Sequence, residues 1–254
     1  SMTTTQLVAM TTAQIAAMQT ADVAALGTTQ VASLTTTQLV SATTAQIAGL
    51  TTAQVAGLGT TQVSSLTSSQ LAAMTTTQLV AMETSDLAVV TTSQLAGLTT
   101  AQMAAMTTTQ VVGLGSTQVS VLTTSQLAAM TTTQIAAMEA SDLAAITTAN
   151  ITGLTTAQVA GMGTTQISSL TTSQLVAMTT AQIAAMETAD VAAMGTTQVA
   201  ALTTAQVVAL GTTQVASLTT AQLVALTTEQ VTAMESQDLA ALTTAQISGL
   251  LKAL

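Results

Sequence analysis

Residues 3–34 read TTTQLVAM, TTAQIAAM, QTADVAAL and GTTQVASL, and this eight-residue unit decides the fold. From Thr3 onward the sequence divides without a gap into 31 such octads, the last ending at Leu250. Position 4 of the octad is Gln, apart from Asp in five octads and Asn150 in one. Position 5 is always large and apolar, and so is position 8 except at Ala42. Self-similarity at a fixed period indicates a repeat protein whose length reflects copy number.

The segment Thr-Thr-x-Gln has the signature of a helix capping box. In such a box the Thr hydroxyl accepts from the backbone N–H three residues on, while the Gln side chain accepts from the N–H of the Thr. The apolar positions 5 and 8 are three apart and share one helix face. Each octad therefore predicts one helix of about seven residues, about 10 Å long. Glycine at position 1 is expected to end the preceding helix in the left-handed conformation; the glycines concerned are Gly27, Gly59, Gly115, Gly163, Gly195 and Gly211.

Two other folds compete with short helices. In one continuous helix, eight residues at about 100° each would rotate the apolar stripe by about 80° per octad, so it would face no single partner. In a β-solenoid, positions 5 and 8 would point to opposite faces of a strand. Thr and Val do favour strands, but the recurring Ala, Leu, Met and Gln favour helices. The pattern favours helices over both alternatives.

One octad cannot fold alone. Ordering eight backbone residues costs roughly 8–16 kcal/mol, whereas burying two large aliphatic side chains returns only about 3–6 kcal/mol. Stacked neighbours must complete the burial. We therefore predict an all-α fold, a solenoid of very short helices, one per octad, with positions 5 and 8 in the core. Small residues at positions 6 and 7 should let helices approach closely.

The composition excludes several classes of function. The chain has 254 residues, of which 48% are hydrophobic and 4% charged, and it contains no aromatic residue, Pro, Cys or His. Without His and Cys the usual nucleophile–base pairs are missing, so no enzyme is predicted. Lys252 is the only basic residue, which argues against nucleic-acid binding. The net charge of −9 repels anionic membranes, and polar residues in every octad interrupt any transmembrane segment.

Three segments are expected along the chain. Residues 1–2 look like an expression scar, residues 3–250 form a continuous array of octads, and residues 251–254 are a C-terminal end or cap. Within the array, a four-octad cassette recurs that opens with Gly and closes with an acidic octad. Cassettes begin at Gly59, Gly115, Gly163 and Gly211. They lie a whole number of octads apart, as expected if whole structural units were duplicated.

The carboxylates are the candidates for a metal or catalytic site. Nine of the ten lie in acidic octads, and Glu229 is the tenth. Apart from Asp22, the nine form pairs three residues apart: Glu83 and Asp86, Glu139 and Asp142, Glu187 and Asp190, Glu235 and Asp238. We interpret them first as groups that stabilise helix N-termini. The alternative is a weak Ca²⁺ site, since carboxylates, hydroxyls and carbonyls are its ligands; no other cofactor is predicted, and hydrolysis by paired carboxylates is disfavoured.

The repeated Gln, Met and Thr residues each have a structural interpretation and a functional alternative. The Gln ladder is interpreted as closing capping boxes, with a peptide-binding strip as the alternative. Met at position 8 exchanges freely with Leu, which favours core filler over a soft binding surface. The Thr rows are explained by capping, with a lattice-templating hydroxyl array as the alternative.

The octad resembles short Thr-Thr-x-Gln-aliphatic repeats found in tandem in very large bacterial secreted and cell-surface proteins of adhesin-like type. The resemblance covers residues 3–250. It implies an extracellular or cell-surface location, an extended segment between other domains of a longer chain, and no catalytic residues. The expected function is a structural or adhesive spacer or stalk. The alternative is a binding solenoid whose acidic octads hold Ca²⁺ or a protein partner, and self-association stays open.

Overall fold

The computed structural model describes residues 2–253, with side chains up to Leu251. Ser1, part of the predicted scar, and Leu254, part of the predicted end segment, lie outside the described residues. The chain forms two compact units, of which the first ends at Leu122 and the second begins at Thr123. Every regular element in residues 2–253 is a helix, which confirms the predicted all-α class.

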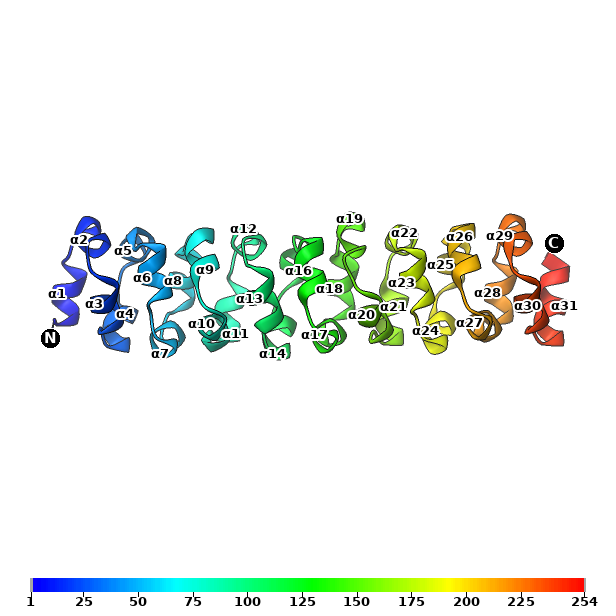
Figure 1. Ribbon diagram of the computed structural model, residues 1–254, viewed down its shortest axis with the longest axis horizontal. Coiled ribbons are helices and arrows are strands. Elements are labelled where there is room, and N and C mark those ends of the chain that lie inside the picture. The colour runs from blue at the N-terminus through cyan, green and yellow to red at the C-terminus, as the bar shows by residue number, and fades with distance from the viewer. Residues whose placement is uncertain (1, 254) are drawn as a thin grey trace. The chain divides into compact units, whose positions relative to one another are not determined.

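Helices α1 to α15 belong to the first unit and α16 to α31 to the second (Figure 1). The helices of the first unit are α1 (Thr4–Val8), α2 (Thr12–Ala16), α3 (Thr20–Ala24), α4 (Thr28–Ser33), α5 (Thr36–Ser41), α6 (Thr44–Ala48), α7 (Thr52–Ala56), α8 (Thr60–Ser65), α9 (Ser68–Ala73), α10 (Thr76–Ala81), α11 (Thr84–Ala88), α12 (Thr92–Ala96), α13 (Thr100–Ala105), α14 (Thr108–Val112) and α15 (Ser116–Val119). Those of the second unit are α16 (Thr124–Ala129), α17 (Thr132–Ala137), α18 (Ala140–Ala145), α19 (Thr148–Ile151), α20 (Thr156–Ala160), α21 (Thr164–Ser169), α22 (Thr172–Ala177), α23 (Thr180–Ala184), α24 (Thr188–Ala193), α25 (Thr196–Ala201), α26 (Thr204–Ala209), α27 (Thr212–Ser217), α28 (Thr220–Val224), α29 (Thr228–Ala233), α30 (Ser236–Ala240) and α31 (Thr244–Ala253).

Each octad forms one helix, but the helices are shorter than the predicted seven residues. Helices α1 to α30 contain four to six residues, and only α31 reaches ten. Position 1 stays extended as the N-cap, as at Thr67 with φ −73° and ψ 155°. Position 8 commonly returns to extended backbone, as at Met74 with φ −61° and ψ 145°. The helix is therefore confined to positions 2–7, because each octad needs extended residues to turn the chain.

The predicted role of the position-1 glycines is wrong. Gly59 has φ −92° and ψ 163°, and no glycine in the described residues has a positive φ. These glycines are N-caps of the helix that follows, in the extended conformation that Thr adopts in other octads. Because position 8 leaves the helix before the glycine is reached, no left-handed residue is needed to end it.

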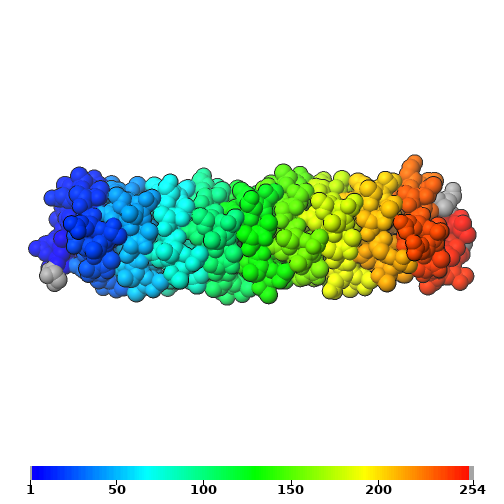
Figure 2. Space-filling model, viewed as in Figure 1, coloured from blue at the N-terminus to red at the C-terminus, as the bar shows by residue number. Residues whose placement is uncertain are grey.

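Within each unit, a helix packs against the helix three places along the chain, as α6 does on α9 and α23 on α26. Positions 5 and 8 line the core between them, and Leu71 is 0% and Met74 3% exposed. Leu239 and Ile247, at position 5 of the last two octads, are 36% and 39% exposed because no later helix covers them. On the face drawn in Figure 2, the described side chains of each unit pack closely between successive helices. Burial therefore depends on neighbours, as expected of a solenoid.

Small residues at position 7 set how closely stacked helices approach. A Cβ added at Gly153 would lie 2.6 Å from the Cα and the carbonyl oxygen of Thr124, three octads earlier. At Gly49 and Gly113, an added Cβ would overlap the methyl groups of Thr20 and Thr84 in the corresponding neighbours. The predicted close approach is thus confirmed, and it brings position 7 of one octad against position 2 of another.

Replacing Gly153 with Ala should destabilise the second unit by about 1–3 kcal/mol, because the new methyl group meets backbone that cannot move aside. Thermal unfolding followed by circular dichroism measures the change. Gly161→Ala is the matched control, since its added Cβ lies no closer than 3.5 Å to any atom outside its chain neighbours. Alanine there also restricts the conformations of the unfolded chain, which favours folding. Equal stability of the two variants would contradict the close packing at Thr124.

Candidate functional site

Glutamine at position 4 is the most regularly placed polar group of the structure. In α7, the Oε1 atom of Gln54 accepts from the backbone N–H of Thr51 at 2.7 Å, and the Thr51 hydroxyl accepts from the N–H of Gln54 at 3.2 Å. Similar boxes begin most of the described helices. The interpretation of the Gln ladder as capping is therefore confirmed.

The same side chain makes a second set of bonds. The Nε2 atom of Gln54 donates to the carbonyl oxygens of Val23 at 3.1 Å, Ala24 at 3.3 Å and Leu26 at 2.7 Å. These acceptors are positions 5, 6 and 8 of the octad four places earlier. Gln54 is only 1% exposed. Each Gln thus begins its own helix and satisfies carbonyls of the preceding superhelical turn.

One superhelical turn holds between three and four octads. Helices three apart pack side by side, and Gln amides reach octads four apart through residues separated by 28 to 31 positions. A hydroxyl bond spans an intermediate separation, since Ser41 Oγ donates to the Thr12 carbonyl 29 residues earlier at 3.3 Å. The neighbours of octad n are therefore octads n − 3 and n − 4.

Sequence reasoning missed this inter-turn bond, although a signal was present. Glu closes a capping box as well as Gln does, yet Glu never occupies position 4. A carboxylate has no N–H to donate. The absence of Glu therefore favours a buried donor at position 4, although Asp replaces that donor in five octads.

Gln158→Met should destabilise the second unit by about 1–3 kcal/mol, because it removes the donor to the buried carbonyls of Leu127 and Met130. Thr155→Ala is the matched control, since it removes the other half of the same capping box and should cost about 1 kcal/mol. Denaturant unfolding compares the two variants. An inter-turn role would be contradicted by a loss at Gln158 no larger than that at Thr155.

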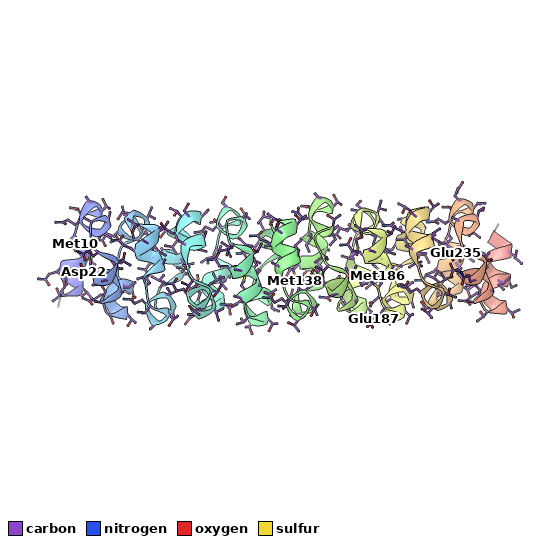
Figure 3. The ribbon with its side chains drawn as sticks, in the orientation of Figure 1. Met10, Asp22, Met138, Met186, Glu187 and Glu235 are labelled. Carbon is purple, nitrogen blue, oxygen red and sulfur yellow. The ribbon has the colours of Figure 1, made fainter. Side chains whose placement is uncertain are left out.

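The predicted carboxylate pairs lie at the starts of α11, α18, α24 and α30, with Glu as N-cap and Asp as the third helical residue. The Glu side chains are exposed, and those of Glu83, Glu139 and Glu235 make no cap hydrogen bond. Figure 3 shows Glu187 at the edge of the ribbon, with its neighbour Met186 in the interior. The two carboxylates of a pair are thus separated by environment, although they belong to the same first turn.

The Asp residues occupy the buried position of Gln. Exposed fractions are 2% for Asp86, 4% for Asp142, 2% for Asp190 and 3% for Asp238, whereas Asp22 is exposed. Asp190 keeps the capping role, because its Oδ2 accepts from the N–H of Glu187 at 3.2 Å. The Oδ2 atom of Asp86, in contrast, is buried without a hydrogen-bond partner in the described residues. A buried acceptor without a donor destabilises the fold.

In the cassettes that begin at Gly59, Gly163 and Gly211, the Gly octad and the acidic octad are direct neighbours. They are three octads apart, and α8 packs on α11, α21 on α24 and α27 on α30. At the last of these contacts the Thr212 hydroxyl donates to Asp238 Oδ1 at 2.9 Å. The cassette is therefore a structural unit in which its first and last helices touch. Nothing in the structure explains why its first residue is Gly.

Burial raises the pKa of Asp86 and of Asp190 above the ordinary value of 3.8. The N–H of the preceding Glu lowers each pKa in part, and the negative charge of that Glu raises it again. Burial and the nearby negative charge both raise the pKa because each disfavours the ionised carboxylate. The protonated form is correspondingly favoured in the folded chain.

In metal-free buffer the free energy of unfolding should fall as the pH rises above about 3.8, and level off above the raised pKa values. The folded chain binds these protons more tightly than the unfolded chain, so deprotonation favours unfolding. Melting curves across this pH range measure the slope. Asp86→Gln with Asp190→Gln should flatten it; an unchanged slope in the double variant would assign the pH dependence to other groups.

The remaining candidate chemistry is sparse in the described part of the chain. Residues 2–253 contain no group of three or more Asp, Glu, His or Cys side chains placed to hold a metal ion. Met138 and Met186 are 4% and 3% exposed, so the interpretation of these Met residues as core filler is confirmed. Within the same residues, none of the helices has both the length and the apolarity needed to cross a bilayer.

These features define a class of protein, the α-helical solenoid built from octapeptide repeats. The chain matches the ALTTAQ repeat over residues 15–52, 43–76, 79–116, 103–132, 135–172, 161–186, 183–220 and 204–236. Since these matches cover most of the sequence, the chain belongs to the ALTTAQ repeat family. The six letters of that repeat occur unchanged at residues 201–206. A search of curated proteins finds no match.

Proposed function

We propose that this chain is a structural spacer in a large bacterial secreted or cell-surface protein of adhesin-like type. In this role the octads from residue 3 to residue 250 act as one series that holds other domains apart. The observation that carries the proposal is the internal use of the repeated polar group. Each inter-turn Gln amide bonds to the fold itself, as Gln54 does to Thr51, Val23 and Leu26, and offers no surface for a ligand.

A spacer must gain length without a new core. Within each unit, successive octads bond to the octads three and four places earlier in the same way, so an added octad extends the array by repeating existing contacts. Stability of such proteins is a sum over repeats and nearest-neighbour interfaces. The duplication of whole cassettes in the sequence fits this requirement.

We also propose that the chain is not an enzyme. Its carboxylate pairs place one group in solvent and the other in the core, as at Glu83 and Asp86. General acid–base catalysis needs both groups within reach of one substrate. The lack of His and Cys in the sequence leaves no stronger nucleophile or base to take their place.

An extracellular or cell-surface location is proposed on the resemblance to repeats of secreted and surface proteins. The acidic net charge of −9 favours solubility of such an apolar array. Antibodies against the octads should label intact cells of the source organism. Labelling that requires permeabilised cells would exclude this location.

Deleting the cassette of residues 59–90 should shorten the particle in proportion to the octads removed, and duplicating it should lengthen it equally. The octad frame is kept in both variants, so the inter-turn contacts re-form. Small-angle X-ray scattering measures the radius of gyration, and circular dichroism per residue controls for folding. In a compact domain the radius of gyration would instead grow as about the 0.38 power of chain length. That result would exclude a spacer.

A further inference from the structure

The carbonyl oxygens that receive each Gln amide form a cradle of acceptors. Around Gln222 Nε2 lie the carbonyl oxygens of Val191 at 2.9 Å, Ala192 at 3.3 Å and Met194 at 2.7 Å. Three oxygens thus converge on one donor nitrogen inside the solenoid. The arrangement is satisfied only while a hydrogen-bond donor or a positive charge occupies that point.

In α11 this donor is missing. Asp86 stands in the place of Gln, and its cradle, by the same register, is the carbonyl oxygens of Val55, Ala56 and Leu58 in α7 and its C-terminal turn. No side chain in the described residues donates to the Leu58 carbonyl. Asp86 is 2% exposed, and its Oδ2 atom has no partner. The buried Oδ2 atom of Asp86 thus has no hydrogen-bond partner in the described residues, and the Leu58 carbonyl lacks the side-chain donor that its counterparts have, although the Val55 carbonyl accepts from the N–H of Leu58.

The chain cannot supply the missing positive charge. Lys252 is its only basic residue, and it lies far along the sequence from Asp86. Asp is one methylene shorter than Gln, so the volume that the amide group fills in other octads is released. The environment thus combines a buried carboxylate with carbonyl acceptors, and the side chain there is shorter than the Gln of other octads.

We infer that a Ca²⁺ ion takes the place of the Gln amide at the buried Asp86, and by the same register at Asp190 and Asp238, and links one superhelical turn to the next. Around Gln222 Nε2, the carbonyl oxygens of Val191 and Met194 lie at 2.9 and 2.7 Å, slightly farther out than the 2.3–2.6 Å of Ca²⁺–oxygen bonds, and that of Ala192 lies at 3.3 Å. Carboxylate and carbonyl oxygens, completed by water, are the ligands that Ca²⁺ takes with flexible geometry. Mg²⁺ is disfavoured, because it requires near-octahedral geometry at about 2.1 Å and sheds water reluctantly.

The same substitution recurs at the other cassettes. By the same register, Asp190 stands opposite the octad that ends at Met162, and Asp238 opposite the octad that ends at Leu210. Neither the Met162 carbonyl nor the Leu210 carbonyl accepts from a side chain in the described residues. The exposed Glu of each pair, such as Glu187, supplies a second negative charge near the helix start. Asp238 already accepts from Thr212, so its need for a cation is smaller than that of Asp86.

This inference goes beyond the proposed spacer and does not depend on it. A spacer whose turns are tied by Ca²⁺ would be stiffer or more stable where calcium is abundant, but the array would remain a spacer without the ion. The two proposals therefore fail separately: particle length tests the spacer, and calcium binding tests the cation.

Equilibrium dialysis of the full chain with ⁴⁵Ca²⁺ tests the inference directly. Binding is expected with a dissociation constant of about 0.1–1 mM, as in extracellular calcium modules, and with one ion each at Asp86, Asp190 and Asp238. Thermal unfolding followed by circular dichroism should show a melting temperature several degrees higher in about 5 mM CaCl2 than in metal-free buffer. Equal concentrations of MgCl2 and matched ionic strength of NaCl should give a much smaller rise.

The decisive variant carries Asp86→Gln, Asp190→Gln and Asp238→Gln. It restores the amide donor of the other octads, so it should fold, melt higher than the wild type in metal-free buffer and lose the calcium response. Glu229→Gln is the matched control, because it removes an exposed carboxylate outside the pairs and should respond to calcium as the wild type does. Calcium binding that survives in the threefold variant would overturn the inference. So would a wild type that responds to lower pH but not to Ca²⁺, since protons alone would then fill the cradle.

Discussion

The bond from the Gln amide to the carbonyls of the preceding turn is the interaction on which the whole structure depends. A helix leaves its first N–H groups and last carbonyl groups without partners inside the helix. In helices of four to six residues these ends make up nearly the entire element, so capping decides whether they exist. Gln54 stabilises the ends of two different helices. Its oxygen caps the start of α7, and its nitrogen donates to the Leu26 carbonyl after the end of α3.

That double role explains which parts of the fold the sequence could predict. Capping boxes and the burial of positions 5 and 8 are local patterns, and both follow from residues a few places apart. The inter-turn acceptors lie 28 to 31 residues away, and in a sequence where every octad looks alike no pattern identifies which copy is the partner. The exclusion of Glu from position 4 signals a donor, but it cannot say where that donor points.

The position-1 glycines show how a local sequence rule can assign a residue to the end of one helix when it caps the start of the next. Position 1 follows one helix and precedes the next, so Gly115 is equally compatible with ending the first or capping the second. Backbone geometry decides: φ is −92°, and the helix before it has already ended at Val112, with Gly113 and Leu114 between them. For the carboxylates, sequence spacing placed both groups of a pair in one first turn but could not show that Asp is buried and Glu is exposed. Burial is set by the octad three or four places earlier, and that neighbour is invisible in a single octad.

The distribution of the acidic octads follows from the cost of placing charge in this core. A buried carboxylate is disfavoured by desolvation and by any like charge nearby, and two such groups in one turn would add a repulsion that low dielectric makes large. Asp86, Asp142, Asp190 and Asp238 are six or seven octads apart, whereas a turn holds between three and four. No superhelical turn therefore contains two of these buried carboxylates. Asp86 interrupts a ladder of donors that is intact on both sides, since Gln78 and Gln94 flank it, so the array tolerates this substitution one turn at a time.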